Sequence, residues 1–217
     1  MRIRIVRHGE SEGNRASTLQ GCRIDAPLSP KGRRQAEALA IRLASEDIDY
    51  VLTSPMQRAL HTARVVEAPH GVGLEVEPVA VEFDWGEWTG QPLDDEMERN
   101  VAGIRTRWKA GDVDLGPPRG ETPVKVAARA RKVLERVLEK GARSPLIVAH
   151  GRFNRILITA LLGRDISRMD DVRQRNSSLT VLDWNGEDPA TALMIDDTSH
   201  LEGALAAPAG KIDSLLR

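Results

Sequence analysis

The chain has 217 residues, a formal net charge of −1 and 41% hydrophobic residues. This length suits one domain or at most a small pair, and the apolar share is ordinary for a globular protein with a sizeable core. The near-neutral charge gives no bulk attraction to nucleic acid or to a membrane surface, so we expect neither as a partner.

Further features argue against export and membrane insertion. Residues 1–7 contain three arginines and lack the apolar stretch of a signal peptide. The longest apolar run, residues 156–162, is interrupted only by Thr159 and is far shorter than the ~18 residues that a membrane-spanning helix needs. The single cysteine, Cys22, cannot form an intrachain disulfide, which fits a reducing compartment. We therefore expect a cytoplasmic location.

Short strand-like runs alternate along the chain with segments of helical periodicity. The pairs Ser29-Pro30, Ser54-Pro55 and Thr122-Pro123 each place an N-cap residue before a proline at the first helical position. In chain order, the predicted elements are a strand at 2–7, a helix from 30, a strand at 49–53, a helix up to 67, a strand at 74–79, a helix from 123 to about 141, a strand at 144–149, a helix at 152–162 and strands at 179–184 and 192–196.

Residues 82–120 depart from this alternation. Trp85, Trp88 and Trp108 lie there among several glycines and prolines, with weak periodicity. We interpret this segment as an inserted lid over one end of the sheet. The alternating elements predict a three-layer α/β/α sandwich with a mostly parallel sheet. We expect a single domain over residues 1–217, with a loosely attached tail at 204–217.

Three chemically reactive segments follow predicted strands: Arg7-His8-Gly9, residues 54–58 and His150-Gly151. In an open α/β sheet the ligand site lies beyond the carboxyl ends of the strands, so these segments are expected to meet. Arginine forks suit phosphate, and Arg58 near a helix N-terminus adds positive charge where anions bind. Nearby positive charge also disfavours protonation of His8, which leaves a neutral nucleophile.

The same residues belong to an ordered series of motifs that resembles the histidine phosphatase superfamily, which includes cofactor-dependent phosphoglycerate mutases. The resemblance covers roughly residues 2–200. Its motifs are Arg7-His8-Gly9-Glu10-Ser11 with Asn14, Asp25-Ala26-Pro27-Leu28-Ser29 with Gly32, Ser54-Pro55-Met56-Gln57-Arg58-Ala59 with Thr62-Ala63, residues 82–90, Gly120-Glu121-Thr122 and Val148-Ala149-His150-Gly151.

The resemblance implies that His8 is the nucleophile that becomes phosphohistidine, and that Glu82 protonates the leaving oxygen. Arg7, Arg58 and His150 would act with them by binding the transferring phosphoryl group. Further phosphate- or substrate-binding residues implied in the same way are Asn14, Gln20, Gly21 and Gly151. The expected partner is a small-molecule phosphomonoester, and neither a metal ion nor an organic cofactor is implied.

Two features favour hydrolysis over the alternative, a 2,3-bisphosphoglycerate-dependent phosphoglycerate mutase. Gln20-Gly21 before the Asp-x-Pro-Leu segment resembles phosphatase members. The span from Glu82 to Glu121 is also shorter than the insertion with which mutases shield the phosphoenzyme from water. We therefore expect a phosphomonoester hydrolase of the metal-independent histidine acid type. The natural substrate, the oligomeric state and the roles of Cys22 and His200 are not readable from these motifs.

Other classes fit the sequence less well. A metal-dependent hydrolase is disfavoured because no His-x-x-x-His spacing occurs and paired arginines would repel a cation. A non-catalytic binding module is disfavoured because every motif position is filled. The P-loop pattern is missing, and the closest Rossmann-like glycine pair, Gly71 and Gly73, lacks a third glycine at position 76.

Overall fold

The protein is described here by a computed structural model that covers residues 1–187 and 189–202. Its strands are β1 (Arg2–Arg7), β2 (Tyr50–Thr53), β3 (Leu74–Val76), β4 (Pro145–Ala149), β5 (Leu179–Asp183) and β6 (Thr191–Asp197). Its α-helices are α1 (Glu12–Arg15), α2 (Pro30–Leu43), α3 (Gln57–Glu67), α4 (Asp95–Lys109), α5 (Pro123–Glu139) and α6 (Gly151–Leu161). Short 3-10 helices occupy Pro78–Ala80, Gly86–Trp88, Ile166–Asp171 and Ser199–Leu201. The expected tail at 204–217 lies outside the described residues.

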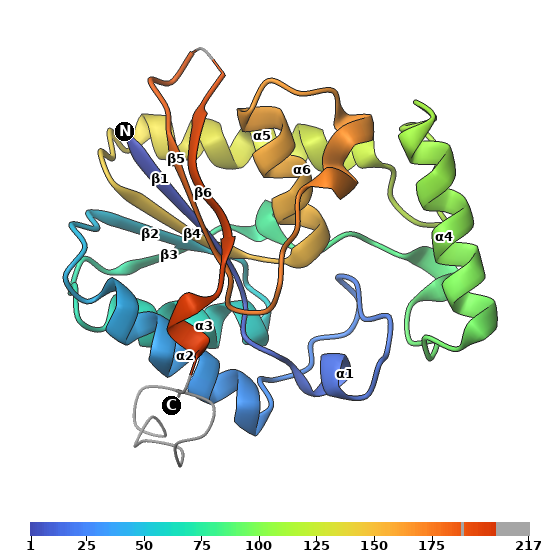
Figure 1. The fold of residues 1–217 in the computed structure, drawn as a ribbon, viewed down its shortest axis with the longest axis horizontal. Helices are drawn as coiled ribbons and strands as arrows, with labels where there is room; N and C mark the ends of the chain where they lie inside the picture. Colours follow the sequence, from blue (N-terminus) through green and yellow to red (C-terminus); the bar gives the residue numbers. More distant parts are fainter. Residues whose placement is uncertain (188, 203–217) are drawn as a thin grey trace.

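The six strands form one sheet in the order β3-β2-β4-β1-β5-β6. The pairs β3–β2, β2–β4 and β4–β1 are parallel, whereas β5 runs antiparallel to both β1 and β6. Helices α2 and α3 lie on one side of the sheet and α5 and α6 on the other (Figure 1). The predicted three-layer α/β/α architecture with a mostly parallel sheet is therefore confirmed.

Each face of the sheet has its own buried apolar cluster. Leu39 and Leu43 of α2 pack with Val51 and Val148 of the sheet on one side. On the other side, Val133 of α5 and several α6 residues pack against Ile3, Ile5 and Ile147. Strands β1 and β4 lie between other strands and are covered on both faces, so all five residues of β4 and four of the six residues of β1 are buried. The sheet is thus a rigid platform for whatever follows its strand ends.

Two of the three predicted hydroxyl caps are confirmed. The Ser29 side chain accepts a hydrogen bond from Gly32 N before α2, and Thr122 accepts one from Lys125 N before α5. The third prediction is wrong, because α3 begins two residues later than Ser54-Pro55 suggests. Its N-cap is Met56, with no side-chain cap bond. Ser54 is therefore available for another contact.

The segment at 82–120 contains an unpredicted 15-residue helix, α4. Only Met97, Ile104 and Trp108 of this helix are buried, so most of its surface is polar and its apolar stripe is too sparse to recognise in the sequence. The helix is held by Trp108, whose ring centroid lies 5.6 Å from that of Phe83 and whose Nε1 donates to Leu115 O at 2.7 Å. No helix among the described residues is long and apolar enough to cross a membrane.

Candidate active site

The sheet brings the two His-Gly segments together at one edge. Strands β1 and β4 are adjacent and parallel, so His8 and His150 follow them side by side. His8 N donates to Ala149 O at 3.0 Å, and the two imidazole centroids lie 5.1 Å apart. Both residues are buried, with 2% and 0% of their surface exposed. The expectation that these segments meet at the strand ends holds in the fold.

The hydrogen bonds of His8 define which ring nitrogen carries the proton. Nδ1 lies 2.6 Å from Gly9 O, and a carbonyl oxygen can only accept, so Nδ1 is the protonated nitrogen. Nε2 then keeps its lone pair and accepts from Arg58 Nε at 3.3 Å. A neutral imidazole with its lone pair on Nε2 is the form that a nitrogen nucleophile requires, and a phosphorus atom would have to take the place of the Arg58 contact.

The Arg58 guanidinium is held on three sides within this cluster. Besides its bond to His8, Nη1 donates to Ile24 O and Nη2 to Gly21 O, both at 2.9 Å. Gly21 has a φ of +55°, a conformation that favours glycine, and this turn presents its carbonyl to the arginine. Gly21 therefore orients Arg58, which is a more specific role than the sequence suggested.

Ser54 determines the tautomer of His150. Ser54 Oγ accepts from Met56 N at 3.3 Å and lies 2.8 Å from His150 Nε2, and we assign the hydroxyl as the donor in this second contact. Since Nε2 accepts, the proton of the neutral ring must sit on Nδ1. That Nδ1 is buried and has no hydrogen-bond partner among the described residues. The ring thus presents an unsatisfied donor, which favours an incoming acceptor.

Arg7 completes the positive cluster from the other side of His150. Its Nη1 donates to Gln174 O at 2.7 Å, while its buried Nε has no partner in the described part of the chain. A Cβ built on Gly151 would lie 3.2 Å from this Nε, so the absence of a side chain there leaves room beside the guanidinium. Gly151 therefore keeps the first turn of α6 open towards Arg7.

Glu82 lies at the N-terminus of α6. Its Oε1 accepts from Phe83 N at 2.9 Å and Phe153 N at 3.0 Å, and its Oε2 accepts from Arg152 N at 3.2 Å. Its negative charge raises the pKa of Arg7 and of Arg58, opposing the larger lowering by burial. The carboxylate is thus within electrostatic reach of both guanidinium groups, although it donates or accepts no hydrogen bond with either.

Asn14 and Gln20 belong to the loop that surrounds the cluster rather than to its centre. Asn14 Oδ1 accepts from Asn176 Nδ2 at 3.2 Å, and Asn176 Nδ2 also donates to His8 O at 3.2 Å. Gln20 Oε1 accepts from Ser11 Oγ at 3.1 Å, which ties the buried amide to the loop. The structure therefore connects Asn14 to His8 through one side chain, whereas Gln20 forms no hydrogen bond with His8, Arg58 or His150.

Burial and charge set the protonation states of the cluster. Burial, followed by the charges of Arg58 and Arg7, lowers the pKa of His8 well below its usual value. Burial and the Arg58 charge do the same for the pKa of His150. Burial also lowers the pKa of Arg7 to about 10, which still leaves it charged at neutral pH.

This arrangement is suited to holding a tetrahedral oxyanion. Neither Arg7 nor Arg58 forms an ion pair within the described residues, and an uncompensated buried charge is costly until an anion arrives. Preorganised donors of this kind stabilise phosphoryl transfer. Among the described residues, no group of three or more His, Cys, Asp and Glu side chains could hold a metal ion.

The sequence did not reveal several contacts on which the cluster depends. Ser54 looked like a helix cap, and the carbonyl groups of Ile24 and Gln174 carry no side-chain signal at all. Asn176 belongs to none of the motifs that carry the resemblance, yet it links Asn14 to His8. The one usable signal was the hydroxyl at position 54, because a serine directly after a strand at the reactive edge can contact a neighbouring strand end.

Comparisons with known proteins show the family to which the chain belongs. The model of the histidine phosphatase superfamily (branch 1) matches residues 3–197. A relative described as probable phosphoglycerate mutase GpmB of Photorhabdus laumondii is 33% identical over 190 residues, which is 85% of each chain. Another of that description, from Yersinia enterocolitica, is 31% identical over 208 residues, or 93% of this chain and 95% of the relative.

The similar solved structures include proteins described as phosphatases. A mycobacterial glucosyl-3-phosphoglycerate phosphatase in complex with VO3 has a TM-score of 0.81 and 27% identity, covering 91% of this chain and 99% of that one. The alpha-ribazole phosphatase of Shigella flexneri has a TM-score of 0.77 and 27% identity, covering 91% of this chain and 96% of that one. The described relatives and structures thus include both mutases and phosphatases.

Proposed function

Because the chain belongs to the histidine phosphatase superfamily, we propose that it is a phosphomonoester hydrolase that works through a phosphohistidine at His8. The observation that carries the proposal is the buried cluster in which a neutral His8, two guanidinium groups and an unsatisfied His150 donor converge. We propose water, rather than a sugar acid, as the acceptor of the phosphoryl group. This choice rests on similar structures described as phosphatases, which match this chain over nearly their full length.

In the first step, the Nε2 lone pair of His8 attacks phosphorus and the bond from phosphorus to the ester oxygen breaks. The leaving oxygen takes the electron pair of that bond and receives a proton from Glu82, so a neutral alcohol departs. Arg7, Arg58 and the Nδ1–H of His150 hold the phosphoryl oxygens, where positioning and charge stabilisation supply most of the catalysis. The Gly9 carbonyl stabilises the Nδ1–H as the ring becomes cationic.

In the second step, Glu82 takes a proton from water, and the resulting hydroxide attacks phosphorus. The bond from phosphorus to Nε2 breaks and its electron pair returns to His8, which regenerates the neutral ring and releases inorganic phosphate. The segment 82–120 is proposed to act as a lid over this site, and the whole chain is proposed to be one domain. The mutase alternative differs only in the acceptor, because 2,3-bisphosphoglycerate would maintain the phosphoenzyme.

Labelling during turnover tests the proposal directly. With ³²P-labelled substrate, we expect a phosphorylated protein whose label is labile in acid and stable in base, as a phosphorus–nitrogen bond requires. Turnover should continue in the presence of a chelator and without 2,3-bisphosphoglycerate. A metal-activated water would give no labelled protein and would lose activity with the chelator. Turnover that requires 2,3-bisphosphoglycerate would favour the mutase.

The lowered pKa values of the two histidines predict a pH response. Since protonation of either ring is disfavoured by burial and by Arg58, both should stay neutral as the pH falls through 6.5. NMR of histidine-labelled protein should show neither ring titrating between pH 8 and 6. Arg58→Gln removes one of the charges that lower the pKa, so the His8 midpoint should move to higher pH. Midpoints near 6.5 in the unaltered protein would contradict this electrostatic account.

Ser54→Ala tests the assignment of the His150 tautomer. Without the hydroxyl, Nε2 of His150 loses its hydrogen-bond donor. The ring proton is then free to move from Nδ1 to Nε2, and Nδ1 no longer donates to a bound anion. We expect about tenfold weaker inhibition by inorganic phosphate, the size of one hydrogen bond to a charged group. Nitrogen NMR of His150 should show a change in tautomer. Ser178→Ala is the matched control, because that buried Oγ has no hydrogen-bond partner among the described residues. Equal effects of the two variants would refute the assignment.

A further inference from the structure

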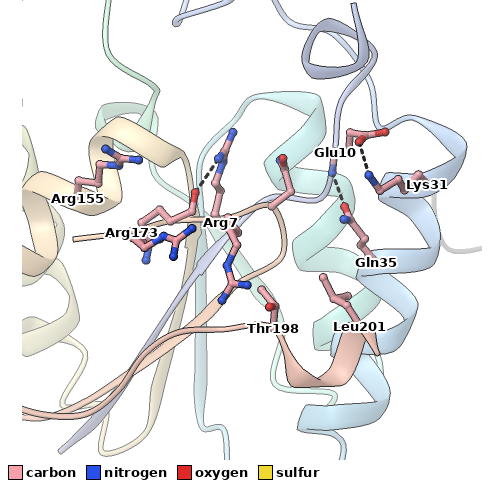
Figure 2. Close-up of a pocket in the computed structure, with 11 residues that line it drawn as sticks. Arg7, Glu10, Lys31, Gln35, Arg155, Arg173, Thr198 and Leu201 are labelled. Atoms are coloured by element: carbon pink, nitrogen blue, oxygen red, sulfur yellow. Dashed lines mark hydrogen bonds and ion pairs between the residues drawn. The ribbon is translucent and has the colours of Figure 1, made fainter. Parts of the chain in front are cut away.

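A cavity lined in part by Arg7 lies at the same edge of the sheet. Its volume is about 480 Å³, within the range of small-molecule sites. The ends of β1 and β6, the loop before β5 and parts of α2 and α6 surround it. Figure 2 shows Arg7, Arg155 and Arg173 along one wall, with Glu10, Lys31 and Gln35 opposite. The phosphohistidine chemistry proposed above assigns no role to this cavity.

The cavity has more positive than negative charge. Five cationic side chains line it, and Glu10 is the single carboxylate among the lining residues. Three of the cations are paired: Lys31 with Glu10 at 2.9 Å, Arg155 with Asp170 at 2.9 Å and Arg175 with Asp196 at 2.7 Å. Arg7 and Arg173 have no carboxylate partner in the described part of the chain. Two positive charges therefore remain for a ligand to neutralise.

Arg7 connects this cavity to the proposed phosphoryl site. One part of its guanidinium, Nε, lies against Gly151, while Nη1 donates to Gln174 O, and Gln174 lines the cavity. Asn176 is a second shared wall, because it lines the cavity and also donates to Asn14 Oδ1 and His8 O. Two anionic groups held on either side of Arg7 would each receive part of its charge, and a single small metabolite could carry both.

We propose that the cavity is a second oxyanion site, in which Arg173 and Arg155, backed by Arg7, bind a phosphate or carboxylate group. The group is either the non-transferred anionic group of the substrate or a separate small anion. In the first case the proposal rests on the proposed function and narrows it to phosphomonoesters that carry a second anionic group. Arg173 supplies the decisive contact, since it is exposed at the cavity wall and unpaired among the described residues.

The kinetic arm uses substrate pairs that differ by one anionic group: glycerol 3-phosphate against 3-phosphoglycerate, and fructose 1-phosphate against fructose 1,6-bisphosphate. Arg173→Ala should raise KM about tenfold for the doubly anionic member of at least one pair, and less than twofold for its partner. The loss corresponds to one charge-assisted hydrogen bond. Arg143→Ala is the matched control, because Arg143 is exposed before β4 at the opposite edge of the sheet. It should change neither KM.

The binding arm uses crystals grown without phosphate or sulfate and soaked in tungstate, a heavy tetrahedral oxyanion. We expect anomalous density in the cavity of the unaltered protein and none there in Arg173→Ala. If Arg173→Ala raises KM only for the doubly anionic member of a substrate pair, the site binds the substrate's own second anionic group. Cavity density without such discrimination assigns it to a separate anion.

The inference is overturned if the cavity holds no tungstate and Arg173→Ala changes KM by the same factor for both members of each substrate pair. Its failure is distinguishable from failure of the proposed function. The latter would appear as no turnover of p-nitrophenyl phosphate and no tungstate between His8 and His150, whatever the cavity contains. Conversely, p-nitrophenyl phosphate turnover with an empty cavity would leave the proposed function standing and remove only the second site.

Discussion

Replacing His8 by alanine is expected to lower kcat for p-nitrophenyl phosphate by at least about 10⁴-fold, the scale on which loss of a covalent nucleophile is usually felt. The reason is geometric as well as chemical. Gly9 O fixes the proton on Nδ1 and Arg58 Nε faces Nε2, so the lone pair has one direction in which to attack. The other imidazole of the cluster, His150, has its Nε2 against Ser54 Oγ at 2.8 Å rather than against Arg58.

The control for this prediction is His70→Ala, which removes an imidazole that lies after α3 and outside the cluster. Its kcat should stay within about twofold of the unaltered protein, as expected for a substitution remote from the chemistry. Thermal unfolding of both variants separates loss of the nucleophile from loss of the fold, since His8 is buried. The His8→Ala protein should be folded and should carry no ³²P label after exposure to substrate. A folded variant with near-normal turnover would refute His8 as the nucleophile.

The parts of the fold and site that are encoded locally were predictable. Strands β1 and β4 are each followed directly by His-Gly, and the parallel arrangement of neighbouring strands is enough to bring their ends together. The caps at Ser29 and Thr122 depend on residues three positions away, so they too are visible in the sequence. In each case the determining contacts lie within one element or follow from strand direction alone.

The parts that were missed depend on contacts between distant residues. Helix α4 is stabilised by packing of Trp108 against Phe83 and Trp85 rather than by a continuous apolar stripe. Ser54 resembles a helix cap in isolation, and only its bond to His150, 96 positions away, gives it a different role. The Gly21 and Ile24 carbonyls that orient Arg58 have no side-chain signature, because the backbone conformation of that loop is set by the whole fold.

Glu82 is the clearest case of a residue that only the family resemblance could select. The chain has 32 acidic residues, and nothing in the sequence around Glu82 distinguishes it from the others. The structure gives it a distinctive place, since it accepts from backbone N–H groups about 70 positions away at the start of α6. This place at the first turn of α6, directly after His150, supports the proposed role of Glu82 at the leaving oxygen.

For Glu82→Gln, we expect kcat/KM to fall by about 10²- to 10⁴-fold with alkyl phosphates, and by less than about tenfold with p-nitrophenyl phosphate. Glutamine has the size of glutamate and keeps one acceptor oxygen, but it holds no proton to transfer. An alkoxide is a strong base and leaves only with a proton, whereas nitrophenolate leaves without one. The measured quantity is kcat/KM, because it contains the steps only up to departure of the alcohol and excludes hydrolysis of phosphohistidine.

The comparison between the two leaving groups is its own control for structural damage. The glutamine amide would place a donor near Arg152 N, where Glu82 Oε2 now accepts at 3.2 Å, so some disturbance of α6 is expected. Such a disturbance reduces the active fraction or displaces the phosphoryl group, and both effects lower kcat/KM equally for every substrate. Only loss of proton donation depends on the basicity of the leaving oxygen. Equal losses for alkyl and nitrophenyl esters would therefore assign Glu82 to the support of α6 rather than to the chemistry.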